Sequence, residues 1–182
     1  LNNPKIAHKC YIIEDNALLT FGEKQLPVTI KGVPEDYTKV SGIDSILIDG
    51  EFATKEGVFN MAVCGVGLAN TLGGGLRYVQ PIWLYVPKRK GTVNLLQPDK
   101  SFNREHAFLT GVYMVQQEKY DNNFLIVPLE LTRKLYDYKT EVSSIELKLV
   151  TEAKEKSVKK EIAEAIGSNY KVLDRYEQQE EF

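Results

Sequence analysis

The sequence predicts an α+β protein in two lobes, with α/β signals at both chain ends and mostly β signals between them. A strand is indicated at residues 145–149, where Ile145, Leu147 and Leu149 alternate with charged residues. A helix follows, because its apolar residues recur at helical spacing: Val158, Ile162, Ala165 and Ile166. Residues 35–140 carry short apolar runs separated by Gly and Pro, which is typical of strands.

The first elements form a hairpin. Residues 7–21 alternate loosely and predict a long strand, residues 22–25 a turn, and residues 28–31 a second strand. The following residues, from Gly32 to Asp36, are expected to end the hairpin.

The middle of the chain predicts short strands with two short helices. We expect a strand or helix at 43–48, a strand running into a helix over 59–72, strands at 81–86, 108–116 and 124–128, and a helix at 129–136. Gly73 is expected to end the first of these helices. At the C-terminus, Gly167 ends the last helix and residues 170–173 form a closing strand, which completes a βαβ unit.

Composition excludes several classes of protein. The net charge of −2 argues against a nucleic-acid partner, since such proteins are usually basic. No apolar stretch approaches the ~20 residues that span a bilayer. The first residues lack the pattern of a signal peptide and no Met begins the chain, so we read it as a fragment of a longer protein.

The cysteines and the glycine-rich segment allow more than one interpretation. Cys10 and Cys64 are either two buried thiols, which we favour, or a disulfide. Gly65, Gly67 and Asn70 almost match a dinucleotide fingerprint, but the third glycine is missing. We therefore expect a tight strand-to-helix turn here rather than a nucleotide site.

Catalytic and metal-binding patterns are weak. His8 and His106 are far apart in sequence, and neither has a second ligand at metal-binding spacing. The acidic pairs are explained by loop and turn positions: Glu14 with Asp15, Glu35 with Asp36, and Asp49 with Glu51. We expect no enzyme, no cofactor and no metal site.

Residues 88–106 are the expected partner-binding segment. They predict a long connection between strands with basic ends and an apolar centre. Its candidate contact residues are Lys88, Arg89, Leu95, Leu96 and Phe102. The alternative is a hairpin that packs on its own β-domain.

Six segments, in this order and spacing, resemble the extracytoplasmic domain of FtsX-like ABC-transporter permeases, the family of MacB and of the LolC and LolE lipoprotein-releasing permeases. The segments are Val28–Tyr37, Leu47–Phe52, Val63–Gly73, Gly111–Asp121, Val127–Leu135 and Glu141–Asp174. The resemblance implies a porter-like α/β subdomain from residues 1–34 and 141–182, with its first strand upstream of Leu1. A β-rich, Sabre-like subdomain at 35–140 would be inserted between its halves.

The resemblance also implies a function and a location. The chain would project into the periplasm from a permease in the bacterial inner membrane. It would couple ATP hydrolysis on a cytoplasmic ATPase subunit to lipoprotein release or efflux, a mechanotransmission role without catalysis. Its partners would be a second permease subunit and a lipoprotein, adaptor or peptide cargo. The alternatives are a stand-alone extracytoplasmic binding module and a small α/β enzyme.

Overall fold

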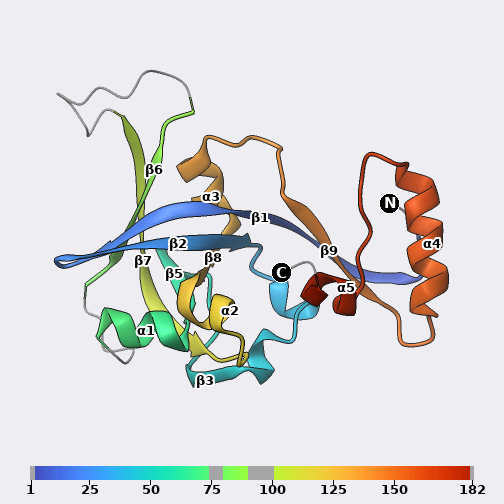
Figure 1. Ribbon diagram of the computed structural model, residues 1–182, viewed down its shortest axis with the longest axis horizontal. Helices are drawn as coiled ribbons and strands as arrows, with labels where there is room; N and C mark the ends of the chain where they lie inside the picture. Colours follow the sequence, from blue (N-terminus) through green and yellow to red (C-terminus); the bar gives the residue numbers. More distant parts are fainter. Residues whose placement is uncertain (1–2, 74–79, 90–100, 181–182) are drawn as a thin grey trace. The chain divides into compact units, whose positions relative to one another are not determined.

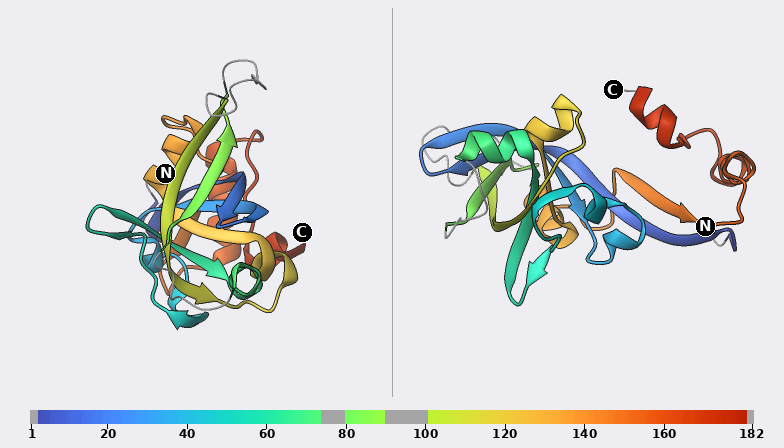
Figure 2. Two further views of the ribbon diagram at one scale, coloured as in Figure 1. Left: turned by 90° about the vertical axis from the view of Figure 1, so that its left-hand side faces the viewer. Right: turned by 90° about the horizontal axis from the view of Figure 1, so that it is seen from below.

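The computed structural model describes residues 3–73, 80–89 and 101–180 and confirms the α+β class (Figures 1 and 2). The strands are β1 (Ile6–Phe21), β2 (Lys24–Val33), β3 (Leu47–Gly50), β4 (Lys55–Glu56), β5 (Phe59–Gly65), β6 (Ile82–Pro87), β7 (Phe102–Tyr113), β8 (Phe124–Pro128) and β9 (Ser144–Leu149). The helices are α1 (Val66–Leu72), α2 (Glu118–Asn123), α3 (Leu129–Tyr136), α4 (Glu155–Ile166) and α5 (Arg175–Glu180), with 3-10 turns η1 (Tyr37–Lys39) and η2 (Ile43–Ser45). No helix within the described ranges is long and apolar enough to cross a membrane.

The chain divides into two compact units. The larger unit is Cys10–Glu146, and the smaller one combines Leu1–Lys9 with Leu147–Phe182. β1 and β9, which pair with each other, contribute residues to both units. The subdomain boundaries expected from the sequence, 1–34 with 141–182 around 35–140, remain a proposal.

The larger unit contains a closed ring of six strands. Its strands pair in the order β1, β2, β8, β5, β7 and β6, and β6 pairs again with β1. Two of these pairings, β2 with β8 and β5 with β7, are parallel. β3 and β4 lie outside the ring, on β7 and β5 respectively. Closure of a sheet into a barrel removes its exposed edges and encloses a core.

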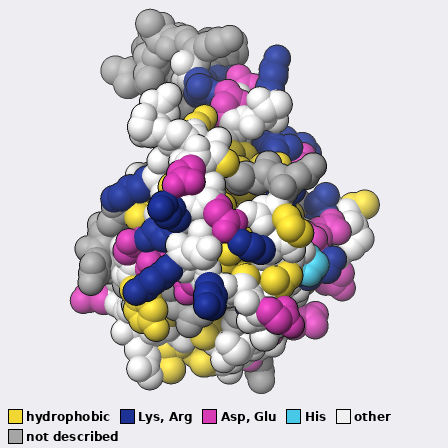
Figure 3. All heavy atoms as spheres, turned by 90° about the vertical axis from the view of Figure 1, so that its right-hand side faces the viewer, with side chains coloured by type: hydrophobic (Ala, Val, Ile, Leu, Met, Phe, Trp, Pro, Cys, Tyr) yellow, Lys and Arg dark blue, Asp and Glu magenta, His cyan; other side chains and the backbone are white. Residues whose placement is uncertain are grey.

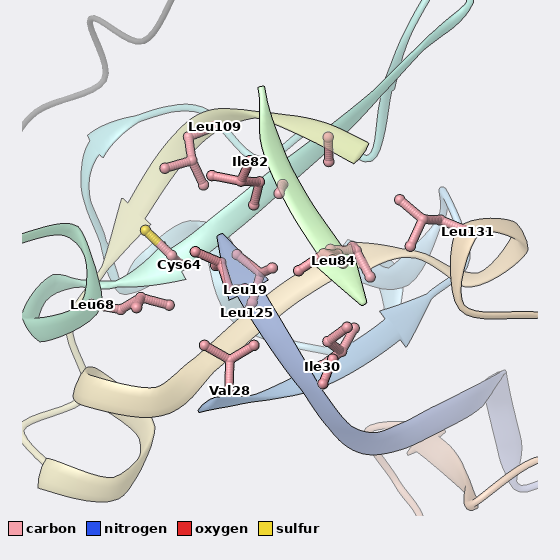
Figure 4. Packing of buried hydrophobic residues seen from close by; sticks show 14 of the residues in the cluster. Leu19, Val28, Ile30, Cys64, Leu68, Ile82, Leu84, Leu109, Leu125 and Leu131 are labelled. Carbon is pink, nitrogen blue, oxygen red and sulfur yellow. The ribbon is translucent and has the colours of Figure 1, made fainter. Parts of the chain in front are cut away.

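Apolar side chains fill the barrel and also cover part of its outside. Leu19, Val28, Ile30, Leu84 and Leu125 point toward one another in the main core cluster (Figure 4). A second cluster uses the other face of the same strands and packs against η1 and η2; it contains Cys10, Ile12, Val33, Tyr37, Ile43, Val63, Tyr113, Phe124 and Ile126. β5 and β8 therefore bury both faces, which explains why their sequences are continuous apolar runs.

Helices α1 and α3 pack against opposite ends of the barrel core. Each helix directly follows a strand, α1 after β5 and α3 after β8. Because β5 and β8 are antiparallel, their last residues lie at opposite ends of the barrel. Leu68 of α1 and Leu131 of α3 both belong to the main core cluster and lie on its two sides (Figure 4).

The predicted N-terminal hairpin is confirmed. Phe21 pairs with Lys24, so a two-residue loop joins β1 and β2, and Gly22 adopts φ 56 there. Gly32 does not break β2 as expected, since the strand continues to Val33. A Cβ at Gly32 would lie 2.1 Å from Oγ1 of Thr132, so this glycine lets α3 pack directly on the strand.

The glycine-rich segment forms the expected strand-to-helix turn. Gly65 ends β5 and precedes α1. A Cβ on Gly65 would lie 2.3 Å from the carbonyl oxygen of Asp121, and one on Gly67 would lie 1.8 Å from Oδ1 of Asn122. The two glycines therefore make room for α2, and their spacing is explained by packing between helices. Gly73 ends α1 at φ 129, as predicted.

Both cysteines are free and buried, which confirms the interpretation as two thiols. Cys64 belongs to the main core cluster and Cys10 to the second one. Burial raises the pKa of Cys64 to about 12 and also raises the pKa of Cys10. The strand expected at 145–149 is also confirmed, as is the helix expected from the spacing of Val158, Ile162, Ala165 and Ile166.

The smaller unit contains α4. The buried side chains of this helix are Val158 and Ile162. Lys5 at the start of the chain forms an ion pair with Glu161 of α4, with Nζ and Oε1 2.5 Å apart. Gly167 ends α4 with φ 77, as predicted.

The closing strand expected at 170–173 was wrong, because these residues have no regular structure and α5 follows them. Asp174 caps α5 by accepting hydrogen bonds from the N–H groups of Tyr176 and Glu177. Glu177 in turn accepts one from the N–H of Asp174. This reciprocal capping box stabilises a helix start, and Lys159 of α4 forms ion pairs with both carboxylates.

We expect Gly65→Ala to destabilise the larger unit by about 1–3 kcal/mol, because the new methyl group meets a fixed backbone carbonyl of α2. Urea unfolding followed by circular dichroism measures this change. Gly42→Ala is the matched control, since its Cβ would have only Ser45 Oγ nearby, at 3.4 Å. Equal stability of the two variants would contradict the close approach of α1 and α2.

Candidate partner surface

The predicted partner segment begins and ends within a β-hairpin. β6 and β7 pair antiparallel from Ile82 opposite Ala107 to Pro87 opposite Phe102. The connection expected at 88–106 is therefore shorter, because β7 already begins at Phe102 and includes the last five residues of that range. Lys88 and Arg89 are exposed, Phe102 is half-buried, and Leu95 and Leu96 lie outside the described residues.

The early start of β7 was hidden by its polar sequence. Residues 103–106 are all polar, so no apolar alternation marks them as a strand. In the structure, Nδ2 of Asn103 donates a hydrogen bond to the carbonyl oxygen of Leu135, 3.0 Å away in α3. This contact satisfies a carbonyl in the last turn of a helix, where no backbone partner is available.

Arg89 already has partners within the larger unit. Its Nη1 lies 3.2 Å from Oε1 of Glu141, and its guanidinium lies 4.8 Å from the ring centroid of Tyr138. The hydroxyl of Tyr138 donates to Oδ2 of Asp15 at 3.2 Å. Arg89, at the basic start of the predicted segment, therefore contacts the residues between α3 and β9, and these in turn contact β1.

The carboxylate of Glu141 is strongly stabilised in its charged form. Hydrogen bonds from its own N–H, from the N–H of Lys139, from the guanidinium of Arg89 and from the N–H of Thr140 lower its pKa to about 2. The amides of Lys139 and Thr140 lie 2.8 and 3.1 Å from Oε2. Glu141 therefore stays ionised over the physiological pH range.

A surface depression beside Arg89 is lined mainly by cations. Its residues are Lys88, Arg89, Asn103, Lys134 and Asp137. Asp137 caps α3 in the left-handed conformation at φ 53, a role more often taken by Gly. Three cations and one carboxylate suit a contact with an acidic group, and sequence reasoning identified only Lys88 and Arg89 of this set.

A partly buried polar cluster was not foreseen from the sequence. Lys31 of β2 forms an ion pair with Glu146 of β9, 2.5 Å between Nζ and Oε1, and the hydroxyl of Tyr37 donates to Oε2 at 2.9 Å. Burial alone would lower the pKa of Lys31, but the charge of Glu146 raises it above its ordinary value. Burial raises the pKa of Tyr37 to about 12.

Three of the acidic residues expected in loops and turns lie in strands. Glu14 and Asp15 belong to β1, opposite Lys31 and Ile30 of β2. Burial raises the pKa of Glu14. Asp49 likewise lies in β3. Within the described part of the chain, no three His, Cys, Asp or Glu side chains gather as metal ligands do.

Charges of both signs are interspersed on the face of the molecule drawn in Figure 3. Lys and Arg side chains alternate there with Asp and Glu, and no broad area of one sign forms. Nucleic-acid binding needs a basic patch or stripe, so this face offers no such surface.

Comparison with solved structures identifies the fold. The periplasmic region of MacB from Actinobacillus actinomycetemcomitans superposes with a TM-score of 0.62 at 14% identity, covering 91% of this chain and 68% of that chain. The extracellular domain of the noncanonic ABC-type transporter YknZ from Gram-positive bacteria gives 0.60 at 14% identity, covering 90% of this chain and 76% of that chain. Neither a protein-family model nor a curated protein sequence matches the chain.

The chain has the fold of a MacB-like periplasmic domain. This result confirms, at the level of the fold, the resemblance seen in the order of the six sequence segments. At 14% identity the likeness concerns architecture, so the partners of the MacB-like domain described here must be argued from its own residues.

We expect Glu141→Gln to lower the melting temperature of the MacB-like domain at pH 7. The lowered pKa of Glu141 means that its stabilising effect is present above about pH 4.3, the ordinary Glu value. The effect is lost as the pH falls toward about 2, the value for Glu141 in the folded protein. The difference between variant and parent should therefore shrink over this acidic range in thermal melts.

Glu164→Gln is the matched control for this pH series. The side chain of Glu164 is exposed on α4, and its contact with Lys160 is long, at 3.9 Å. Exposed pairs of this kind contribute little to stability. A Glu141→Gln difference that persists unchanged at the lowest pH would contradict the assigned hydrogen bonds.

Proposed function

We propose that this chain is the extracytoplasmic domain of an ABC-transporter permease of the FtsX and MacB type. The observation that carries the proposal is the shared fold with MacB and YknZ domains over nine-tenths of the chain. The location would be the periplasmic side of a bacterial inner membrane. The domain would act through protein contacts, while a separate cytoplasmic ATPase subunit hydrolyses ATP.

The mechanical part of the proposal rests on the two-unit architecture. β1 and β9, which pair with each other, each contribute residues to the barrel unit and to the unit formed by both chain ends. Strands with hydrogen-bonded neighbours transmit displacement better than a flexible linker does, because their backbone is already ordered. Such a domain would couple ATP hydrolysis to lipoprotein release or to efflux, with a second permease subunit and a lipoprotein, adaptor or peptide as partners.

The proposal is tested on the full-length protein. We expect it in the membrane fraction, with residues 10–146 accessible to protease added outside the cytoplasm, and we expect it to copurify with an ATP-hydrolysing subunit. Deletion of residues 10–146 should abolish transport and leave basal ATP hydrolysis. A full-length protein that is not associated with a membrane would favour the stand-alone binding module instead.

The segment that contains Leu95 and Leu96 remains the proposed cargo or adaptor contact, together with Lys88, Arg89 and Phe102. We expect Leu95→Ser with Leu96→Ser to leave the melting temperature nearly unchanged. Apolar anchors of this kind contribute on the order of 1–2 kcal/mol each when a partner buries them, so the same change should impair transport.

Circular dichroism melts and a transport assay of the same double variant are the measurements. Unfolding of the variant would mean that the segment packs on its own β-domain. Normal melting with normal transport would exclude it as a contact.

A further inference from the structure

One face of the barrel carries several half-buried aromatic side chains, with the exposed side chains of Val58 and Phe59 beside them. We call it the outer aromatic face and define it by Leu18, Val58, Phe59, Trp83, Tyr85, Arg104, His106 and Phe108. On β6 these residues alternate with Ile82, Leu84 and Val86, which belong to the main core cluster, so Trp83 and Tyr85 point outward. Figure 2 shows β6 and β7 side by side across this side of the molecule in its left panel.

Strand register places these residues in rows. Leu18 of β1 lies opposite Tyr85 of β6, which lies opposite Arg104 of β7. The next row is Thr20, Trp83 and His106. Directly opposed residues of antiparallel strands share one face, so the rows form one continuous surface.

Ring contacts extend this surface toward the β4–β5 hairpin. The Trp83 and His106 ring centroids are 4.9 Å apart, and those of His106 and Phe108 are 6.2 Å apart. Phe108 contacts Phe59 edge to face at 5.6 Å. Phe59 is 53% exposed and its neighbour Val58 is 90% exposed, so the hairpin presents two large apolar side chains to water. Exposed apolar side chains gathered in this way mark interaction sites.

The composition of the face is that of a protein interface. Trp, Tyr, Phe and Arg are enriched at interface centres and dominate binding energies there. A sugar would stack on an open aromatic ring, whereas the guanidinium of Arg104 lies 5.4 Å from the ring centroid of Trp83 and His106 packs beside it. The rings are thus engaged with each other and offer a packed apolar surface rather than a stacking platform.

The charge of Arg104 determines what kind of protein can bind the outer aromatic face. Arg104 is the one formally charged residue of the outer aromatic face and it is exposed. A partner that buries Arg104 has to supply a carboxylate, because an unpaired buried cation is costly. Two copies of this chain meeting through the face would bring cation toward cation, which disfavours self-association.

We propose that the outer aromatic face binds a segment of a different protein that combines apolar side chains with an Asp or Glu. The inference rests on the proposed function, since it assigns the surface through which a transporter partner would be recognised. The carboxylate pairs with Arg104, and the apolar side chains cover Trp83, Phe108 and Phe59.

Trp83 is the only tryptophan of the chain, so its fluorescence reports directly on this face. The probe is a random peptide library selected against the purified chain. We expect enriched peptides to combine apolar residues with a carboxylate and to shift Trp83 emission to shorter wavelengths on binding. Arg104→Glu should weaken the selected peptides by about tenfold or more, and Arg104→Lys should retain most of the affinity.

Tyr170→Ala is the matched control, because Tyr170 is 71% exposed but lies outside the outer aromatic face. It should bind the peptides as the parent does. Thermal melts of all variants test whether they fold. We expect the Arg104 variants to melt as the parent does, because Arg104 is exposed. Failure to enrich peptides, enriched peptides without a carboxylate, or equal affinity for the Arg104→Glu variant would each overturn the proposal.

Two further measurements test whether a second copy of this chain or a glycan occupies the outer aromatic face instead. Sedimentation velocity should give a monomer over a wide concentration range, and a dimer that Arg104→Glu alters would assign the face to a second copy instead. A saturable emission change with a soluble β-glucan oligosaccharide would assign it to a glycan. Peptide binding is measured on the purified chain, so a full-length protein that fails the membrane and ATPase test would refute the proposed function without refuting the peptide site.

Discussion

The parallel pairing of β5 with β7 closes the barrel, and most of the larger unit depends on it. Without that pairing the six strands would form an open sheet with two edges, one at β5 and one at β7. Exposed edges promote aggregation, and an open sheet would also expose the apolar residues that now face inward. Gly111 of β7 lies at this junction, where a Cβ would come within 2.6 Å of the carbonyl oxygen of Glu51. β7 can therefore carry no side chain at position 111.

Polar contacts attach β9 and η1 to the strand β2 of the larger unit. The ion pair of Lys31 and Glu146 joins β2 to β9, and Tyr37 adds a hydrogen bond from η1. About a fifth of each charged side chain is exposed. Breaking a surface ion pair costs up to about 1 kcal/mol of folding free energy, and breaking a fully buried one costs about 3–5 kcal/mol. We expect the loss of stability for this pair to lie between these values. The cluster therefore anchors β9 at the residue where the larger unit ends.

Several elements could be predicted from the sequence because their signals are local. The β1–β2 hairpin follows from alternation around Gly22, and α4 follows from the spacing of Val158 and Ile162. The start of β7 was missed because residues 103–106 are polar on both faces of the strand. The helix α5 was missed although Asp174 and Glu177 form a recognisable capping box, since the apolar run before them suggested a strand.

The candidate surfaces could be predicted only in part, because they depend on strand register. Lys88 and Arg89 were identified from their charge, but the contacts of Arg89 with Glu141 and Tyr138 join residues about fifty positions apart. The row of Leu18, Tyr85 and Arg104 draws on three strands, and β1 is far in sequence from the β6–β7 hairpin. No periodicity within one segment shows that such residues share a face.

The composition of the smaller unit has a consequence for the order of events during synthesis. Residues 10–146 form one continuous stretch, so this unit can acquire its contacts as soon as that stretch has been synthesised and has reached the compartment where it folds. Lys5 and its partner Glu161 are separated by 156 residues, so the smaller unit has to wait for nearly the whole chain. Until α4 arrives, the first residues of the chain lack their helix partner and are open to proteases and to chaperones. The barrel unit can therefore fold before the unit that needs both ends of this chain.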